Sequence, residues 1–159
     1  MKNLVSISNE IASLTVEWEP ILMKLTEDVV TLRKNSQNRS IKQIIGHLID
    51  SATNNTHRIV HLHYQPLPLI FPNYATLGNN DRWIKIQGYQ NEEWINLVQL
   101  CKYSLLHISH VIKNADPDKC NNEWISGPGK TVTMEAMISD FPPHLKLHLS
   151  EINELIEKD

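Results

Sequence analysis

Two histidines, His144 and His148, stand four residues apart near the end of this 159-residue chain. On a helix this spacing places two imidazoles on one face about one turn apart, close enough to bind the same divalent metal ion if a third ligand comes from elsewhere. The same pair can instead be core histidines that hydrogen-bond to neighbouring side chains. Spacing alone leaves these two interpretations equally open.

A second histidine pair, His57 and His61, has the same spacing, and the direction of each pair separates them. At roughly 100° per residue, His57 and His61 project away from the apolar side of their helix, which predicts surface positions. His144 and His148 align with the apolar stripe of the last helix, so they should face the interior. Buried imidazoles need partners, because an unsatisfied buried polar group costs on the order of 1–3 kcal/mol.

The candidate for a third ligand is His47, which lies beside the apolar arc of its own helix. The polar residues that continue its strip along the helix are Ser51, Asn54, Asn55 and Arg58. Such a strip at the edge of an inward face indicates a lined cavity. Gly46 costs a helix interior roughly 1 kcal/mol relative to alanine, which suggests that a neighbouring element approaches closely there.

Apolar residues at spacings of three and four predict four helices that position these side chains. The helices span about residues 8–34, 40–64, 91–115 and 133–157. The first should bend near Pro20, and the second should start with a capping box of Ser40 and Gln43. Pro142 and Pro143 predict a kink in the fourth helix or a new start capped by Asp140. The fold class expected is all-α, a single antiparallel four-helix bundle domain over residues 1–159.

Two connections between these helices are long. Residues 65–90 are rich in aromatic side chains and are expected to pack over a bundle end or to line a pocket. Residues 117–132 contain Gly127-Pro-Gly-Lys130, which does not follow a strand and lacks the spacing of a phosphate-binding loop. We therefore expect a turn at this point.

Composition excludes several classes of protein. The formal net charge is -3 without long runs of either sign, which argues against a nucleic-acid partner. No apolar segment has the length of a membrane span or the form of a signal peptide, so we expect a cytoplasmic protein without a membrane partner. Cys101 and Cys120 have no Cys-x-x-Cys spacing and are expected to be free thiols.

Three segments in order resemble the DinB-like superfamily, and most closely its YfiT-type bacillithiol transferase branch. They are Ile45-Gly-His-Leu-Ile-Asp-Ser-Ala-Thr-Asn-Asn55, Phe71-Pro-Asn-Tyr74 with Asp81-Arg-Trp-Ile-Lys-Ile-Gln-Gly-Tyr89, and Asp140-Phe-Pro-Pro-His-Leu-Lys-Leu-His-Leu149. The resemblance implies an up-down-down-up bundle, often a homodimer, with a divalent metal bound by one histidine of the second helix and an His-x-x-x-His pair of the fourth. Those positions match His47, His144 and His148. The two prolines before His144 depart from the family's pattern.

Three imidazoles that leave positions open describe a catalytic type of metal site, for which zinc and nickel are both suitable. In the branch that the chain resembles, the metal would activate a low-molecular-weight thiol, so the first hypothesis is a metal-dependent S-transferase acting on electrophilic small molecules. The alternatives are a metal-dependent hydrolase of small amides or esters and a non-enzymatic metal- or ligand-binding stress protein. No catalytic residue is assigned. The candidates for the cavity wall or for support of the ligands are Ser51, Asn54, Asn55, Arg58 and Glu151.

Overall fold

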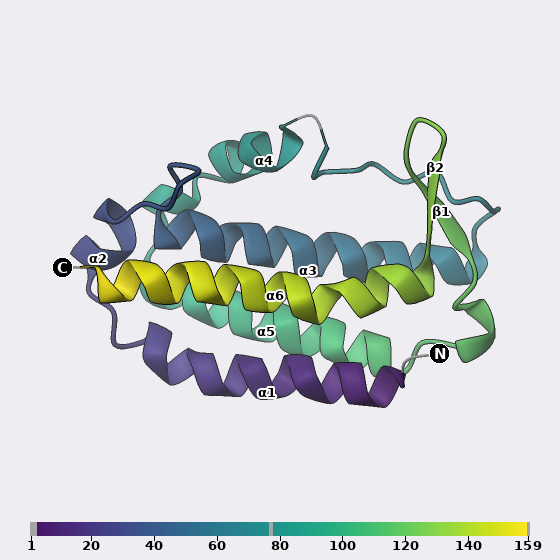
Figure 1. The fold of residues 1–159 in the computed structure, drawn as a ribbon, viewed down its shortest axis with the longest axis horizontal. Coiled ribbons are helices and arrows are strands. Elements are labelled where there is room, and N and C mark those ends of the chain that lie inside the picture. The colour runs from purple at the N-terminus through teal and green to yellow at the C-terminus, as the bar shows by residue number, and fades with distance from the viewer. Residues whose placement is uncertain (1–2, 77, 159) are drawn as a thin grey trace.

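Four long helices make up the body of the computed structural model, which describes residues 3–76 and 78–158. They are α1 (Leu4–Leu22), α3 (Ile41–Tyr64), α5 (Trp94–Lys113) and α6 (Met134–Glu157). Helix α5 packs against α1 and α3, and α6 packs against α3 and α1. In Figure 1, α3 and α5 run from left to right, whereas α1 and α6 run from right to left. The predicted four-helix bundle is confirmed.

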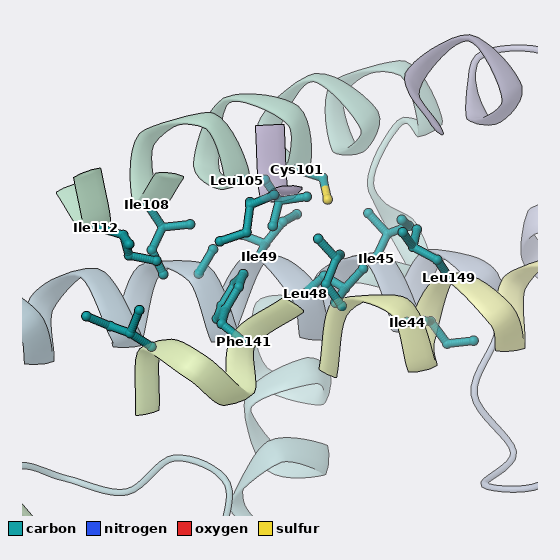
Figure 2. Packing of buried hydrophobic residues seen from close by; sticks show 14 of the residues in the cluster. Ile44, Ile45, Leu48, Ile49, Cys101, Leu105, Ile108, Ile112, Phe141 and Leu149 are labelled. Atoms are coloured by element: carbon teal, nitrogen blue, oxygen red, sulfur yellow. The ribbon is translucent and has the colours of Figure 1, made fainter. Parts of the chain in front are cut away.

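The core between these helices consists mainly of isoleucine and leucine side chains at helical spacing. Figure 2 shows part of this packing, where α3, α5 and α6 meet. The residues labelled there are Ile44, Ile45, Leu48, Ile49, Cys101, Leu105, Ile108, Ile112, Phe141 and Leu149. Each large side chain that is removed from water contributes about 1.5–3 kcal/mol, so this apolar face fixes how the helices pack. None of the described helices combines the length and the hydropathy that a membrane crossing needs.

Local contacts near the start of α3 define where the helix begins and how closely Tyr89 packs against it. Ser40 Oγ accepts a hydrogen bond from the Gln43 amide (3.3 Å), and Gln43 Oε1 accepts one from the Ser40 amide (2.9 Å). A Cβ atom at Gly46 would lie 2.1 Å from the Tyr89 ring. The predicted capping box and the close approach at Gly46 are therefore both confirmed.

The first predicted helix is divided in the structure. Helix α1 ends at Leu22, and a short α2 (Glu27–Leu32) follows after a turn. Pro20 cannot donate a backbone hydrogen bond near the end of α1, and Thr26 followed by Glu27 and Asp28 is a typical helix start. The prediction of one bent helix over residues 8–34 was wrong, because apolar spacing continues across the break.

The aromatic connection after α3 contains regular structure. Helix α4 (Asn79–Gln87) and the 3-10 turn η1 (Tyr89–Asn91) occupy its second half. Figure 1 shows α4 alongside the first half of α3, on the outside of the bundle. Arg39, just before α3, pairs with Asp81 of α4 at 2.6 Å. This segment therefore covers the side of α3 that carries His47 and Asp50 rather than forming a loop throughout.

The second connection adds a small sheet to an otherwise helical fold. After the 3-10 turn η2 (Pro117–Lys119), strands β1 (Glu123–Gly127) and β2 (Lys130–Thr133) pair antiparallel, with Trp124 opposite Val132. The Leu69 amide donates to the Glu123 carbonyl (2.8 Å), which ties this hairpin to the other connection. The all-α expectation was wrong here because these strands are too short for a clear alternation. The turn predicted at Gly127–Lys130 is the hairpin tip.

Helix α6 continues through Pro142 and Pro143 without a new start. Its cap is Thr133, whose Oγ1 accepts a hydrogen bond from the Ala136 amide at 3.1 Å. Of the two alternatives predicted at the prolines, a new helix start capped by Asp140 was therefore wrong. Phe141 and Leu145, on either side of the prolines, are buried, and this packing outweighs the two backbone donors that proline lacks.

Candidate metal centre

Three histidines from two helices converge in the interior. His47 Nε2 on α3 lies 3.3 Å from His144 Nε2 on α6, and His148 Nε2 lies 3.1 Å from His144 Nε2. One ring nitrogen from each of the three lies within 4.8 Å of the others. His47 and His148 are only 4% and 7% exposed, and His144 is half-buried. The structure therefore brings together the three residues proposed from the sequence as metal ligands.

The spacing of these nitrogens fits a shared cation. With metal–nitrogen bonds of 2.0–2.1 Å, two ligands of a tetrahedral site lie roughly 3.3 Å apart. A ring nitrogen of a neutral imidazole is either a donor or an acceptor, so His144 Nε2 cannot donate to one neighbour and accept from the other. A cation that accepts a lone pair from each ring satisfies all three at once. The residues present thus fit a divalent metal ion.

The surroundings keep the imidazoles of His47 and His144 neutral, which is the form that binds metal. Burial lowers the pKa of His47 to about 3, and the neighbouring His148 and His144 add to this effect. Burial also lowers the pKa of His144 to about 4, with a further contribution from His148. At neutral pH no proton has to be displaced from either ring before a cation binds.

The two ends of the site differ in what lies behind the ligand ring. His148 Nδ1 donates a hydrogen bond to Glu151 Oε2 at 2.8 Å, which leaves the Nε2 lone pair directed at the other histidines. His47 Nδ1 is buried without a hydrogen-bond partner among the described residues. Asp50, three residues further along α3, accepts instead from the Tyr89 hydroxyl and from Gln87 Nε2, each at 2.7 Å. Of these two rings, only that of His148 has a carboxylate hydrogen-bonded behind it.

A cleft of about 490 Å³ opens beside His144. Three of the five residues predicted for its wall, Ser51, Asn55 and Arg58, line it. Asn54 is buried elsewhere and donates its side-chain amide to the Asp50 carbonyl oxygen at 2.9 Å. Glu151, the fifth, contacts His148 as described above. The polar strip read from α3 therefore divides between the cleft and the interior.

Both connections supply cleft residues that helical periodicity did not indicate. Tyr74 comes from the aromatic connection, Trp124 from β1, and Met137, Asp140 and Phe141 from α6. Tyr74 belongs to one of the segments that carry the family resemblance, so a signal for it existed. No such signal existed for Trp124, because its position depends on a hairpin that was not predicted from the sequence.

The second histidine pair does not form a comparable centre. His57 is exposed, and His61 is half-buried with its Nδ1 2.9 Å from the Tyr64 hydroxyl. In the part of the chain that the structure describes, His47, His144 and His148 are the one group of three histidine, cysteine or acidic residues with metal-ligand spacing. The prediction of surface positions is confirmed for His57, whereas His61 is half-buried against Tyr64 and Phe71.

Comparisons with known proteins support the fold. No protein-family model matches the chain, and no curated protein matches its sequence. Among solved structures, the chain is similar to YfiT from Bacillus subtilis, with a TM-score of 0.80 and 13% sequence identity over 94% of this chain and 83% of that chain. That protein is described as a probable metal-dependent hydrolase with an unusual four-helix bundle topology. At this identity the likeness shows the fold alone, a four-helix bundle, which is the fold that the resemblance implied.

Proposed function

We propose that the chain binds a divalent metal ion through His47, His144 and His148 and acts as a metal-dependent S-transferase. Its substrates would be a low-molecular-weight thiol and an electrophilic small molecule. The observation that carries the proposal is the convergence of three histidine side chains at the edge of an open cleft. A metal ion bound there lowers the pKa of a thiol or a water molecule and so supplies a nucleophile near neutral pH.

The side chains around the histidines favour a thiol over water. Glu151 Oε2 is engaged by His148 and Asp50 Oδ1 by Tyr89 and Gln87, and neither carboxylate lines the cleft. Asp50 Oδ2 is buried without a hydrogen-bond partner among the described residues. A free thiol has a pKa near 8.5, whereas that of bulk water is near 15.7. A thiol therefore needs less help from a protein base than a water molecule does.

A hydrolase is the second candidate, and one residue favours it. Asp140 lines the cleft, lies four residues before His144 on α6 and is exposed, so it can exchange protons with a ligand. The description of YfiT, a protein of similar fold, as a probable metal-dependent hydrolase is a second reason to consider this alternative. The substrates would then be small amides or esters.

The proposal has four further parts, of which the helix order and the assembly rest on the resemblance. We propose zinc or nickel as the metal, an up-down-down-up order of helices, the aromatic connection as a wall of the site, and a homodimer as the assembly. The helix directions in Figure 1 support the second of these, and the place of Tyr74 in the cleft supports the third.

Thiol consumption tests the proposed function. Purified protein loaded with zinc or nickel is mixed with one of several small thiols and a chloronitrobenzene, and loss of free thiol is followed. A carbon–sulfur bond forms, chloride leaves, and the thiol proton passes to solvent. We expect a rate that depends on both metal and thiol. Hydrolysis of ester probes without any thiol would favour the alternative, and no turnover in either assay would favour a non-enzymatic binding protein.

A further inference from the structure

Arg58 is a buried cation on the wall of the cleft. It lies eleven residues after His47 on α3, roughly 16 Å further along the helix axis, and is only 4% exposed. Its guanidinium carbon lies 3.8 Å from the centre of the Trp124 ring and 5.3 Å from that of Phe71. Its Nη1 donates to Asn55 Oδ1 at 2.7 Å. The group is therefore held in one orientation by its neighbours.

This cation has no anionic partner in the part of the chain that the structure describes. No ion pair joins Arg58 to a described carboxylate, and its Nε and Nη2 atoms are buried without any hydrogen-bond partner. Burial lowers the pKa of Arg58 to about 10, so the side chain stays charged at neutral pH. An unpaired charge in the interior is costly, and proteins normally supply it with a counter-charge.

The two free atoms lie on one edge of the guanidinium. Nε and Nη2 point in parallel and match the two oxygens of a carboxylate, a geometry that lysine cannot provide. Stacking of the guanidinium face on Trp124 leaves this edge as the remaining site for a ligand. The edge is closed to water in this structure, so a ligand has to displace side chains of the cleft wall to reach it.

We propose that Arg58 binds the carboxylate of a small-molecule ligand that occupies the cleft beside the three histidines. Arg58 and His144 line the same cleft of about 490 Å³, which is large enough for a ligand to contact both. This inference rests on the proposed function, which places the reacting end of the ligand at the three histidines. It adds the chemical class, an anionic substrate or thiol, and it assigns Arg58 as the residue that selects it.

Calorimetric titration with succinate tests the inference on the metal-loaded full chain. We expect saturable binding of succinate and none of dimethyl succinate, its neutral counterpart. Arg58→Met should abolish succinate binding, and Arg58→Lys should weaken it about tenfold or more, because it keeps the charge but loses the two-point contact. Arg82→Met, which removes an exposed arginine of α4, should bind like the wild type.

Absence of succinate binding to the wild type, or equal binding by Arg58→Lys, would overturn the inference. Arg58→Lys keeps the measurement possible if Arg58→Met does not fold. A His144→Ala variant separates the two proposals, because it should lose metal and still bind succinate. Rates of consumption of thioglycolate and mercaptoethanol then locate the carboxylate: a preference for thioglycolate that requires Arg58 places it on the thiol, and equal rates place it on the electrophile.

Discussion

The two histidine pairs of this protein have the same spacing and different surroundings. His57 and His61 lie on α3, where one side chain is exposed and the other rests against Tyr64. His144 and His148 lie on α6, meet His47 across the bundle, and have Glu151 behind one ring. Spacing places two imidazoles on one helix face. A metal site needs in addition a ligand from a facing helix and a carboxylate that fixes a ring.

The largest expected effect comes from a substitution beside His47 that disturbs how α3 packs. Gly46→Ala would place a methyl group against the Tyr89 ring, so we expect a loss of about 1–3 kcal/mol in the free energy of unfolding, measured with denaturant. Alanine normally stabilises a helix interior by roughly 1 kcal/mol over glycine. A decrease in the free energy of unfolding therefore identifies the contact with Tyr89 as its cause. Gly127→Ala, where a Cβ meets nothing within 4 Å, is the control. A more stable Gly46→Ala variant would show that Tyr89 does not pack there.

The second expected effect is on metal affinity, when the residue that contacts one histidine of each pair is substituted. Glu151→Ala removes the acceptor of the His148 Nδ1 proton, so we expect a loss of about 10–100-fold in metal affinity, measured by competition with a chelator. Tyr64→Phe removes the hydroxyl that contacts His61 and should leave metal affinity unchanged. Equal effects of the two substitutions would remove the distinction between the pairs.

A third expected effect is on the pH dependence of stability in chelator-treated protein. The pKa of His47 is about 3 and that of His144 about 4 in the folded state, below their ordinary value of 6.5. The unfolded chain therefore binds more protons between these values, and stability should fall as the pH is lowered from about 6.5 towards 3. His47→Gln should make this decline shallower, whereas His57→Gln, at an exposed position, should not. Burial raises the pKa of Asp50, which acts in the opposite sense, so the comparison with wild type isolates His47.

Features that depend on neighbouring residues in the chain were predictable. The capping box of Ser40 and Gln43 requires only four residues, and the facing direction of His144 and His148 follows from helical periodicity alone. Gly46 indicated a close neighbour because glycine is costly in a helix. Each of these predictions uses information that lies within one or two helical turns.

Features that depend on distant segments were not predictable in this way. The break before Thr26 interrupts no apolar spacing, and the pairing of Trp124 with Val132 has too few residues for an alternating pattern. The contacts of Asp50 with Tyr89 and of Arg58 with Trp124 join residues far apart in the sequence. The three candidate ligands were singled out because helix geometry and a family motif agreed. Part of the cleft wall comes instead from the two connections, whose folds neither of these described.

The metal content of purified protein tests the central claim most directly. Elemental analysis should find about one divalent ion per chain in the wild type and in a His57→Ala, His61→Ala double variant. A His47→Ala, His148→Ala double variant, which loses two of three ligands, should retain essentially none after dialysis. Metal that remains bound after the second pair of substitutions, or is lost after the first, would contradict the assignment of His47, His144 and His148 as the metal centre.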